Sequence, residues 1–111
     1  MTIEQVIFTL ILHAGNSKSS SMEAFAAAKK FQFELADQKI QEAEKELNIA
    51  HKMQSDMLTG FAQGKDVPID ILMVHAQDHL NGAIVTLDFV KELIDVEKQI
   101  QKLQTERSTE K

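Results

Sequence analysis

A chain of 111 residues fits one domain, and its composition (43% hydrophobic, 5% aromatic, four Gly, one Pro) favours helices over strands. The net charge is −5 and the 12 basic residues are scattered, which argues against a nucleic-acid-binding protein. There is no cysteine, no signal-peptide start and no apolar run of about 20 residues. We therefore expect a soluble, cytoplasmic protein that has no disulfides and is not inserted in a membrane.

The first predicted helix begins near Thr2, because Thr2 and Gln5 have the spacing of a capping box. Gly15 supplies the backbone freedom found at helix ends, so we expect a break there. A new cap at residues 16–17 would start a second segment that ends near residue 30. Apolar residues repeat at helical spacing before the expected break: Ile3, Ile7, Leu10 and Ala14.

A second helix is predicted from about residue 32 to about residue 61. One of its faces repeats in steps of four and three, which is a heptad seam: Ala36, Ile40, Ala43, Leu47, Ala50, Gln54, Met57 and Phe61. Gln54 is the only strongly polar member of this seam. A loop is expected at residues 60–68, where Gly64 and Pro68 mark turns.

The third helix is predicted from about Pro68 to about Leu103. Its seam has the same spacing: Ile69, Met73, Ala76, Leu80, Ala83, Leu87, Val90 and Ile94. Three long helices joined by short links predict an all-α fold, an antiparallel three-helix bundle whose first helix is broken near Gly15. We place this domain at residues 1–104 and expect the polar residues 105–111 to form a frayed tail.

The third helix also has a second apolar face, opposite its seam, which we call the second stripe. Its members are Ile71, Val74, Asp78, Gly82, Val85, Phe89 and Val96. A helix that is apolar on two opposite sides is buried on both, and a three-helix bundle covers only one. We therefore expect copies of this helix to meet through the second stripe in a symmetric homo-oligomer.

Asp78 lies in the middle of the second stripe, so copies of its carboxylate would converge on a symmetry axis. Like carboxylates in a dry environment must take up protons, bind water or share a hard cation such as Mg²⁺. Alternatively, Asp78 is a polar interruption that fixes the register and the number of copies. The sequence pattern leaves both readings open.

His75 and His79 lie on the flank between the seam and the second stripe, at a spacing that brings side chains together. Such a pair can bind zinc, but the glutamate of the H-E-x-x-H motif is missing and Asp78 points elsewhere. A Ser or Cys triad has little support, because there is no Cys and no G-x-S-x-G motif. Two readings remain: hydrogen-bonded flank residues, or a phosphohistidine site in which an imidazole nitrogen accepts and passes on a phosphoryl group. His13 and His51 are interpreted as ordinary hydrogen-bonded flank residues, although each lies at a helix position that could face the same groove between subunits.

Residues 73–80 (MVHAQDHL) strongly resemble the active-site signature of the lactose/cellobiose-type enzyme IIA components of the bacterial phosphoenolpyruvate-dependent sugar phosphotransferase system. Residues 12–19 (LHAGNSKS) are similar to the break in the first helix of that family. Residues 42–55 resemble its second helix, with Ser55 where Thr is more common. The likeness covers nearly the whole chain and implies a homotrimer of three-helix protomers.

The resemblance implies a role for each residue of the motif. His75 would accept a phosphoryl group from the phosphocarrier protein HPr, as a tele-phosphohistidine, and pass it to a cysteine of the cognate enzyme IIB. Enzyme IIB serves the membrane permease, enzyme IIC, in the uptake of a β-linked disaccharide of cellobiose/chitobiose or lactose type. His79 would assist, Gln77 and Gln54 would be neighbours in binding, and Asp78 would bind a divalent metal, usually Mg²⁺, at the trimer axis.

The chain departs from the family pattern at residues 81–83 (NGA), where Met and Thr are common. This difference bears on trimer packing and metal affinity, whereas His75 and its immediate neighbours match the pattern. A function of another class also fits the sequence: a helical adaptor or structural bundle that carries out no chemistry.

Overall fold

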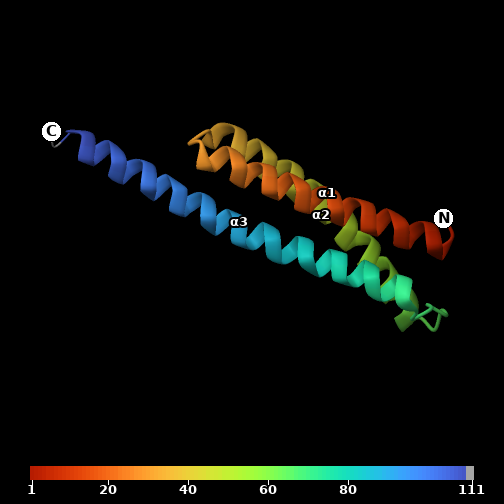
Figure 1. The fold of residues 1–111 in the computed structure, drawn as a ribbon. Coiled ribbons are helices and arrows are strands. Elements are labelled where there is room, and N and C mark those ends of the chain that lie inside the picture. Colours follow the sequence, from red (N-terminus) through yellow and green to blue (C-terminus); the bar gives the residue numbers. More distant parts are fainter. Residues whose placement is uncertain (110–111) are drawn as a thin grey trace.

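The computed structural model describes residues 1–109, and every regular element in that range is a helix (Figure 1). The elements are α1 (Ile3–Lys29), α2 (Phe33–Ala62) and α3 (Ile71–Thr109). α2 runs antiparallel to the other two, which confirms the predicted antiparallel three-helix bundle. The bundle is long and narrow, with extents of 69 × 21 × 18 Å.

The start of α1 is fixed by the predicted capping box. The Gln5 backbone N–H donates to Thr2 Oγ1 at 3.2 Å, and the Thr2 N–H donates to Gln5 Oε1 at 2.9 Å. These two bonds satisfy donors that would lack partners at a helix start.

The predicted break at Gly15 is wrong, because α1 is one helix from end to end. A glycine in a helix interior costs roughly 0.5–1 kcal/mol relative to Ala, which weakens a helix without ending it. Ala14 and Ser17, on either side of Gly15, are fully buried. Ser17 caps nothing; its hydroxyl donates to the Ala43 carbonyl oxygen of α2 at 2.8 Å. Packing on both sides of Gly15 therefore keeps the helix continuous.

The turn between α1 and α2 places Phe31 in the left-handed region, with a φ of 60°. The Phe31 N–H donates to the Ala28 carbonyl at 2.9 Å and the Gln32 N–H donates to the Ala27 carbonyl at 3.0 Å. This is the Schellman pattern that ends many helices, usually with Gly at the left-handed position. Here the Phe31 ring stacks on the Phe33 ring, with centroids 6.0 Å apart. The stacking offsets part of the cost of that backbone conformation.

The link between α2 and α3 lies where the loop was predicted, with Gly64 at a φ of 87°. α3 starts at Ile71, later than the predicted Pro68. The reason is a cap: Asp70 Oδ1 accepts a hydrogen bond from the Met73 backbone N–H at 3.0 Å.

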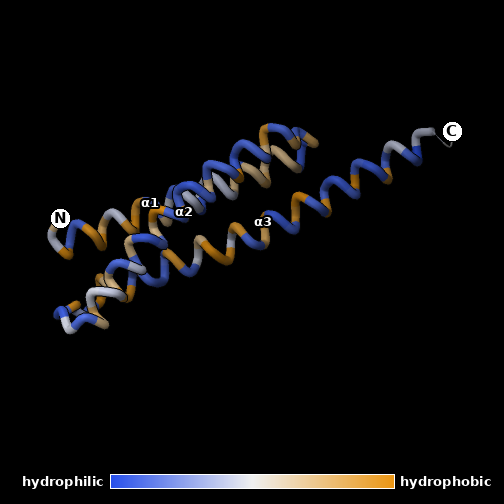
Figure 2. Tube along the Cα trace, turned by 180° about the vertical axis from the view of Figure 1, so that it is seen from behind, coloured by the Kyte–Doolittle hydropathy of each residue, from blue (hydrophilic) through white to orange (hydrophobic). Residues whose placement is uncertain are grey.

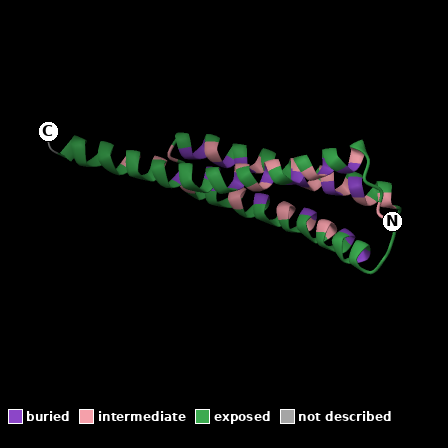
Figure 3. Ribbon diagram, turned by 90° about the horizontal axis from the view of Figure 1, so that it is seen from below, coloured by how far each residue is buried: buried purple, intermediate pink, exposed green. Residues whose placement is uncertain are grey.

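α3 also ends later than predicted. The residues expected to form a frayed tail are helical through Thr109, while residues 110–111 lie outside the described residues. Figure 3 shows that this end of α3 projects past the other two helices and is exposed.

The predicted seam of α3 is its buried face, from Met73 to Ile94. The alanines of the α2 seam are buried too, so the helices approach closely along them. Two predicted seam positions are wrong: Phe61 is 60% exposed and Ile69 is 81% exposed. Ile69 precedes α3, and Phe61 borders an open hollow between α2 and α3. Figure 2 shows hydrophobic positions along α3, and several of these residues, such as Val74 and Phe89, are exposed rather than part of the buried seam.

Polar contacts join α2 to both neighbours. Lys39 Nζ lies 2.9 Å from the Glu23 carboxylate of α1, and this hydrogen bond raises the pKa of the Lys39 amine. Lys91 Nζ of α3 lies 3.3 Å from the Glu44 carboxylate of α2. These ion pairs are partly exposed, so they help to fix which face of α2 meets which helix rather than adding much stability.

Ser17 and Ser21 give a matched test of polar packing, because both are fully buried one turn apart on α1. Ser17 donates a hydrogen bond, whereas the Ser21 hydroxyl has no partner among the described residues. Ser21→Ala should therefore be more stable than Ser17→Ala by about 1 kcal/mol, since helix propensity cancels between the two variants. Urea unfolding followed by circular dichroism measures the difference; equal free energies of unfolding would contradict this account of the core.

Candidate functional site

The histidines of the motif meet on α3. His75 is exposed and His79 is half-buried. Their Nε2 atoms lie 3.1 Å apart, and the rings are edge to face with centroids 4.4 Å apart. The i, i+4 spacing therefore does bring the two imidazoles into hydrogen-bond contact, as predicted.

This contact has a chemical consequence for both rings. A neutral imidazole has one N–H donor and one lone-pair acceptor, so one Nε2 of the pair carries the proton and the other accepts it. Of the two rings, His75 is the more accessible to solvent. The pair thus presents an imidazole nitrogen that a partner can reach, with a second imidazole beside it.

Gln54 and Gln77 form a separate pair across α2 and α3. Gln54 Nε2 donates to Gln77 Oε1 at 2.5 Å, and Gln77 Nε2 lies 3.6 Å from the Met73 sulfur. At 3.6 residues per turn, Gln77 is about 160° around α3 from both His75 and His79. Within one chain, the structure therefore does not bring the two glutamines to the histidines.

An apolar hollow of about 430 Å³ lies beside the glutamine pair, and helical periodicity does not predict it. Its lining comes from the end of α2, the link and the start of α3: Gln54, Met57, Leu58, Phe61, Val67, Ile69, Met73, Val74 and Gln77. Two predicted seam residues, Phe61 and Ile69, line the hollow at the end of α2 and just before α3. No residue of α1 lines it, so these two side chains are not covered by a third helix. Val74 belongs both to this hollow and to the second stripe, so the two apolar surfaces are continuous.

The second stripe is uncovered in the single chain. Its large apolar members are exposed, from 44% at Val85 to 87% at Ile71, and Asp78 is exposed among them. Scattered exposed apolar residues are ordinary, but a continuous stripe along one helix marks an interaction surface.

Asp78 belongs to the second stripe, about 60° around α3 from His75 and about 100° from His79. Within residues 1–109, no three His, Asp or Glu side chains come together to hold a metal ion. One chain supplies a single carboxylate on the second stripe, so a metal at Asp78 would need carboxylates from several copies.

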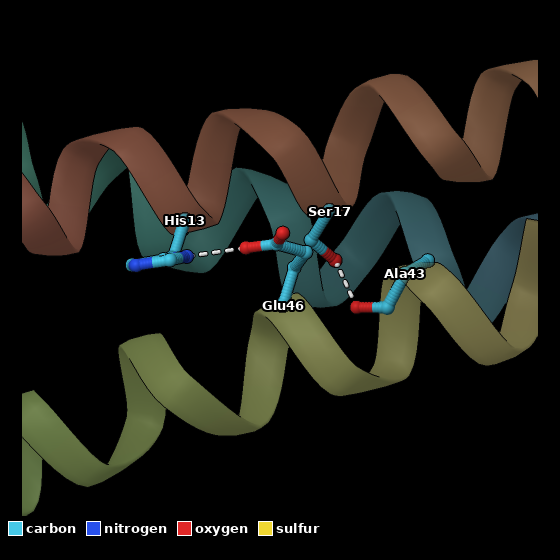
Figure 4. Close-up of polar contacts among 4 residues, drawn as sticks. All are labelled: His13, Ser17, Ala43 and Glu46. Atoms are coloured by element: carbon cyan, nitrogen blue, oxygen red, sulfur yellow. Dashed lines mark hydrogen bonds and ion pairs between the residues drawn. The ribbon is translucent and has the colours of Figure 1, made fainter.

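The other two histidines differ from each other. His13 Nδ1 pairs with the Glu46 carboxylate of α2, next to the bond from Ser17 to the Ala43 carbonyl (Figure 4). This confirms the interpretation of His13 as a hydrogen-bonded flank residue, with an acidic partner on α2 that the pattern within α1 does not predict. His51 is exposed on α2.

Comparison with known proteins gives consistent results. The family model for the lactose/cellobiose-specific IIA subunit of the phosphotransferase system matches residues 5–98. A lichenan-specific phosphotransferase enzyme IIA component of Bacillus subtilis is 45% identical over 98 residues, which are 88% of this chain and 89% of the relative. A cellobiose-specific EIIA component of Lactococcus lactis is 37% identical over 99 residues, covering 89% and 85% of the two chains.

Solved structures agree with the sequence matches. The crystal structure of a cellobiose-specific enzyme IIA from Bacillus anthracis superposes with a TM-score of 0.89 at 37% identity, covering 92% of this chain and 94% of the other. A IIA(chitobiose) chain solved in complex with HPr, from the Escherichia coli phosphotransferase system, has a TM-score of 0.80 at 27% identity and covers 91% and 98%. Within residues 1–109, none of the three helices combines the length and hydrophobicity needed to cross a membrane.

Proposed function

The chain belongs to the lactose/cellobiose-specific IIA family of the sugar phosphotransferase system, and we propose that its His75 carries a phosphoryl group between two proteins. The group would come from phospho-HPr and go to a cysteine of the cognate enzyme IIB, in the cytoplasm, to drive uptake through enzyme IIC. The observation that carries the proposal is the exposed His75 imidazole, whose Nε2 lies 3.1 Å from His79 Nε2.

The pair suggests how the transfer would proceed. When His79 Nε2 carries the proton, His75 Nε2 is unprotonated, and its lone pair becomes the nucleophile as the hydrogen bond from His79 is released. It attacks the phosphorus, and the bond from phosphorus to the donor breaks with its electron pair left on the donor. The product is a tele-phosphohistidine at His75, and the His79 N–H can turn to a phosphoryl oxygen as an assisting donor. In the second step, a thiolate of enzyme IIB attacks the phosphorus and the His75 nitrogen leaves with its electron pair.

We also propose that three copies assemble around α3. The uncovered second stripe supports self-association, and the family resemblance sets the number at three. In a closed ring of identical copies, one side of each copy meets the opposite side of the next. The α2 side of one copy would therefore face the α1 side of its neighbour.

This arrangement gives the glutamine pair a role. Gln54 and Gln77 lie on the α2 side of α3, whereas His75 and His79 lie on the other flank. In the ring, the glutamines of one copy would approach His75 of the neighbouring copy. Their amide N–H groups would donate to phosphoryl oxygens there.

Asp78 would bring three carboxylates together at the axis of such a trimer. Carboxylate oxygens suit Mg²⁺ or another hard divalent ion, so the residue type fits the metal that the family resemblance implies. The ion would neutralise like charges that are costly to bury together. Its role would be structural, since Asp78 lies on the second stripe and not at the contact between the histidines.

For the transported sugar, we propose a β-linked disaccharide of cellobiose/chitobiose or lactose type. The names of the relatives support this class, since they include lichenan-, cellobiose- and lactose-specific components. A choice within the class depends on enzyme IIC, because no feature of the IIA helices contacts sugar in the proposed relay.

The first prediction concerns the phosphoryl acceptor. Incubation with enzyme I, HPr and phosphoenolpyruvate should add one acid-labile phosphate, measured by mass spectrometry. His75→Ala should abolish the gain, and His79→Ala should slow it roughly 10- to 100-fold because one hydrogen bond to the phosphoryl group is lost. His13→Ala is the matched control and should keep the gain, since His13 pairs with Glu46 away from α3. A wild-type chain that takes up no phosphate would favour the adaptor over the relay.

The second prediction concerns Asp78. Asp78→Leu should keep or raise the thermal stability of the trimer, because it replaces buried like charges with an apolar side chain. The same variant should lose the binding of Mg²⁺ or Mn²⁺ measured by isothermal titration calorimetry. A monomeric Asp78→Leu protein in light scattering would show that the second stripe does not lie at the trimer contact.

The third prediction concerns the sugar. Phosphorylation-coupled uptake should occur with cellobiose, chitobiose or lactose when the chain is combined with its cognate IIB and IIC. His75→Ala in the same assay should abolish uptake. Uptake limited to a sugar without a β-linkage would contradict the assigned class while leaving the relay intact.

A further inference from the structure

We propose that His51 of one copy completes the phosphoryl site of the neighbouring copy, where it donates a hydrogen bond to the phosphoryl group on that neighbour's His75. The inference rests on the proposed function and on the ring of copies around α3. It assigns a role to a histidine that the contacts within one chain leave unexplained.

Two contacts of α2 with its neighbours show which side of that helix His51 is on. Glu46 marks the face toward α1, through its contact with His13, and Gln54 marks the face toward α3. At 3.6 residues per turn, Gln54 lies about 80° around α2 from Glu46, and His51 lies about 140° around in the same direction. His51 is therefore past the face that meets α3, on the flank turned away from α1.

A contact on the same flank supports this placement. Glu44 lies two turns before His51, about 20° away around the helix. Its carboxylate reaches Lys91 Nζ of α3 at 3.3 Å. The flank that carries Glu44 and His51 thus borders α3 on its α2 side, where the next copy in a ring would lie.

His51 is directed away from the histidine pair of its own chain. Gln77 marks the α2 side of α3, and His75 and His79 lie about 160° around from it. The body of α3 therefore stands between His51 and its own His75. A contact between them has to come from a different copy.

His51 also lies near the level of His79 along the bundle, within about 8 Å of the level of His75. Gln54 bonds Gln77 and α2 runs antiparallel to α3, so His51, three residues before Gln54, is level with the part of α3 about three residues after Gln77. A rotation about an axis parallel to the helices leaves that level unchanged. When the second stripe faces the axis, the α2 flank of one copy comes beside the histidine flank of the next.

The chemistry of the side chain suits this role. A phosphoryl group needs hydrogen-bond donors to balance its negative charge, and a neutral imidazole supplies one N–H donor. His51 is exposed, so its imidazole is free to approach a neighbouring chain. An exposed side chain of this kind adds little to the stability of its own fold. In the proposed ring of copies, the role of His51 would therefore be to bind the phosphoryl group.

Single variants test whether His51 acts at all. His51→Ala should slow phosphoryl uptake from phospho-HPr roughly 10-fold, with an unchanged melting temperature, because one donor is lost. His51→Gln, which keeps an N–H donor, should recover much of the rate. Thr59→Ala is the matched control, since Thr59 is exposed on α2 about 80° further around the helix from His51. If His51→Ala accepts phosphate at the wild-type rate while His75→Ala accepts none, the inference is wrong and the relay stands.

Mixed assemblies test whether His51 acts on the neighbouring copy. Chains carrying His75→Ala are unfolded and refolded together with chains carrying His51→Ala. If the site is shared between copies, about half of the remaining His75 side chains in an equal mixture gain a neighbour with His51 and recover the wild-type rate. If His51 acts within its own chain, every remaining His75 lacks it and no fast phase appears, which would overturn the inference. A wild-type chain that accepts no phosphate would overturn the proposed function and this inference with it.

Discussion

The structure depends on one constraint, which is that α3 is apolar on two opposite faces while the bundle covers only one. The seam from Met73 to Ile94 is buried against α1 and α2. The second stripe remains exposed along the same helix, with Phe89 at 65% and Val74 at 59%. Covering the second stripe with other copies, as proposed, would place the two flanks of α3 in the grooves between copies. The histidine pair lies on one of those flanks, and the glutamine pair lies on the other.

Close packing of the three helices makes this separation of flanks definite. Alanines form much of the α2 seam, so the helices cannot rotate about their axes without losing close contact. The Ser17 bond to the Ala43 carbonyl and the Glu46 contact to His13 fix α1 against α2. The bond between Gln54 and Gln77 then fixes α2 against α3. Each functional side chain on α3 therefore has a defined direction before any partner binds.

The features that could be predicted from the sequence were repeating patterns and short local motifs. The seams and the contact between His75 and His79 follow from helical periodicity, and the start of α1 follows from the capping box at Thr2. The predicted break at Gly15 is wrong because the low helix propensity of one glycine is outweighed by packing. The residues on both sides of it, Ala14 and Ser17, are buried and keep α1 continuous. α3 starts three residues later than predicted from Pro68, because the Asp70 side chain caps the helix there.

Other features could not be predicted from periodicity, because they depend on the order of the helices around the bundle. Periodicity says which residues share a face of one helix, but it does not say which neighbouring helix that face meets. The contact of His13 with Glu46 and the hollow beside Phe61 both depend on that order. Periodicity alone places Gln77 on the side of α3 opposite His75, but the contact of that side with Gln54 of α2 depends on the order of the helices.

The same order means that one chain alone would be a poor phosphoryl site under the proposed function. It offers the exposed His75 imidazole and the neighbouring His79 imidazole, while the amides of Gln54 and Gln77 lie on the other side of α3. A phosphoryl group on His75 would then be surrounded mainly by water, which competes for its oxygens and can hydrolyse the N–P bond. The apolar stripe that needs covering runs between the two flanks, so an assembly that buries it also brings donors from one copy to the nucleophile of the next. In such a design, the free energy of apolar burial that holds the copies together also positions the donors. The stability of the assembly and its capacity to carry a phosphoryl group would then have the same physical origin.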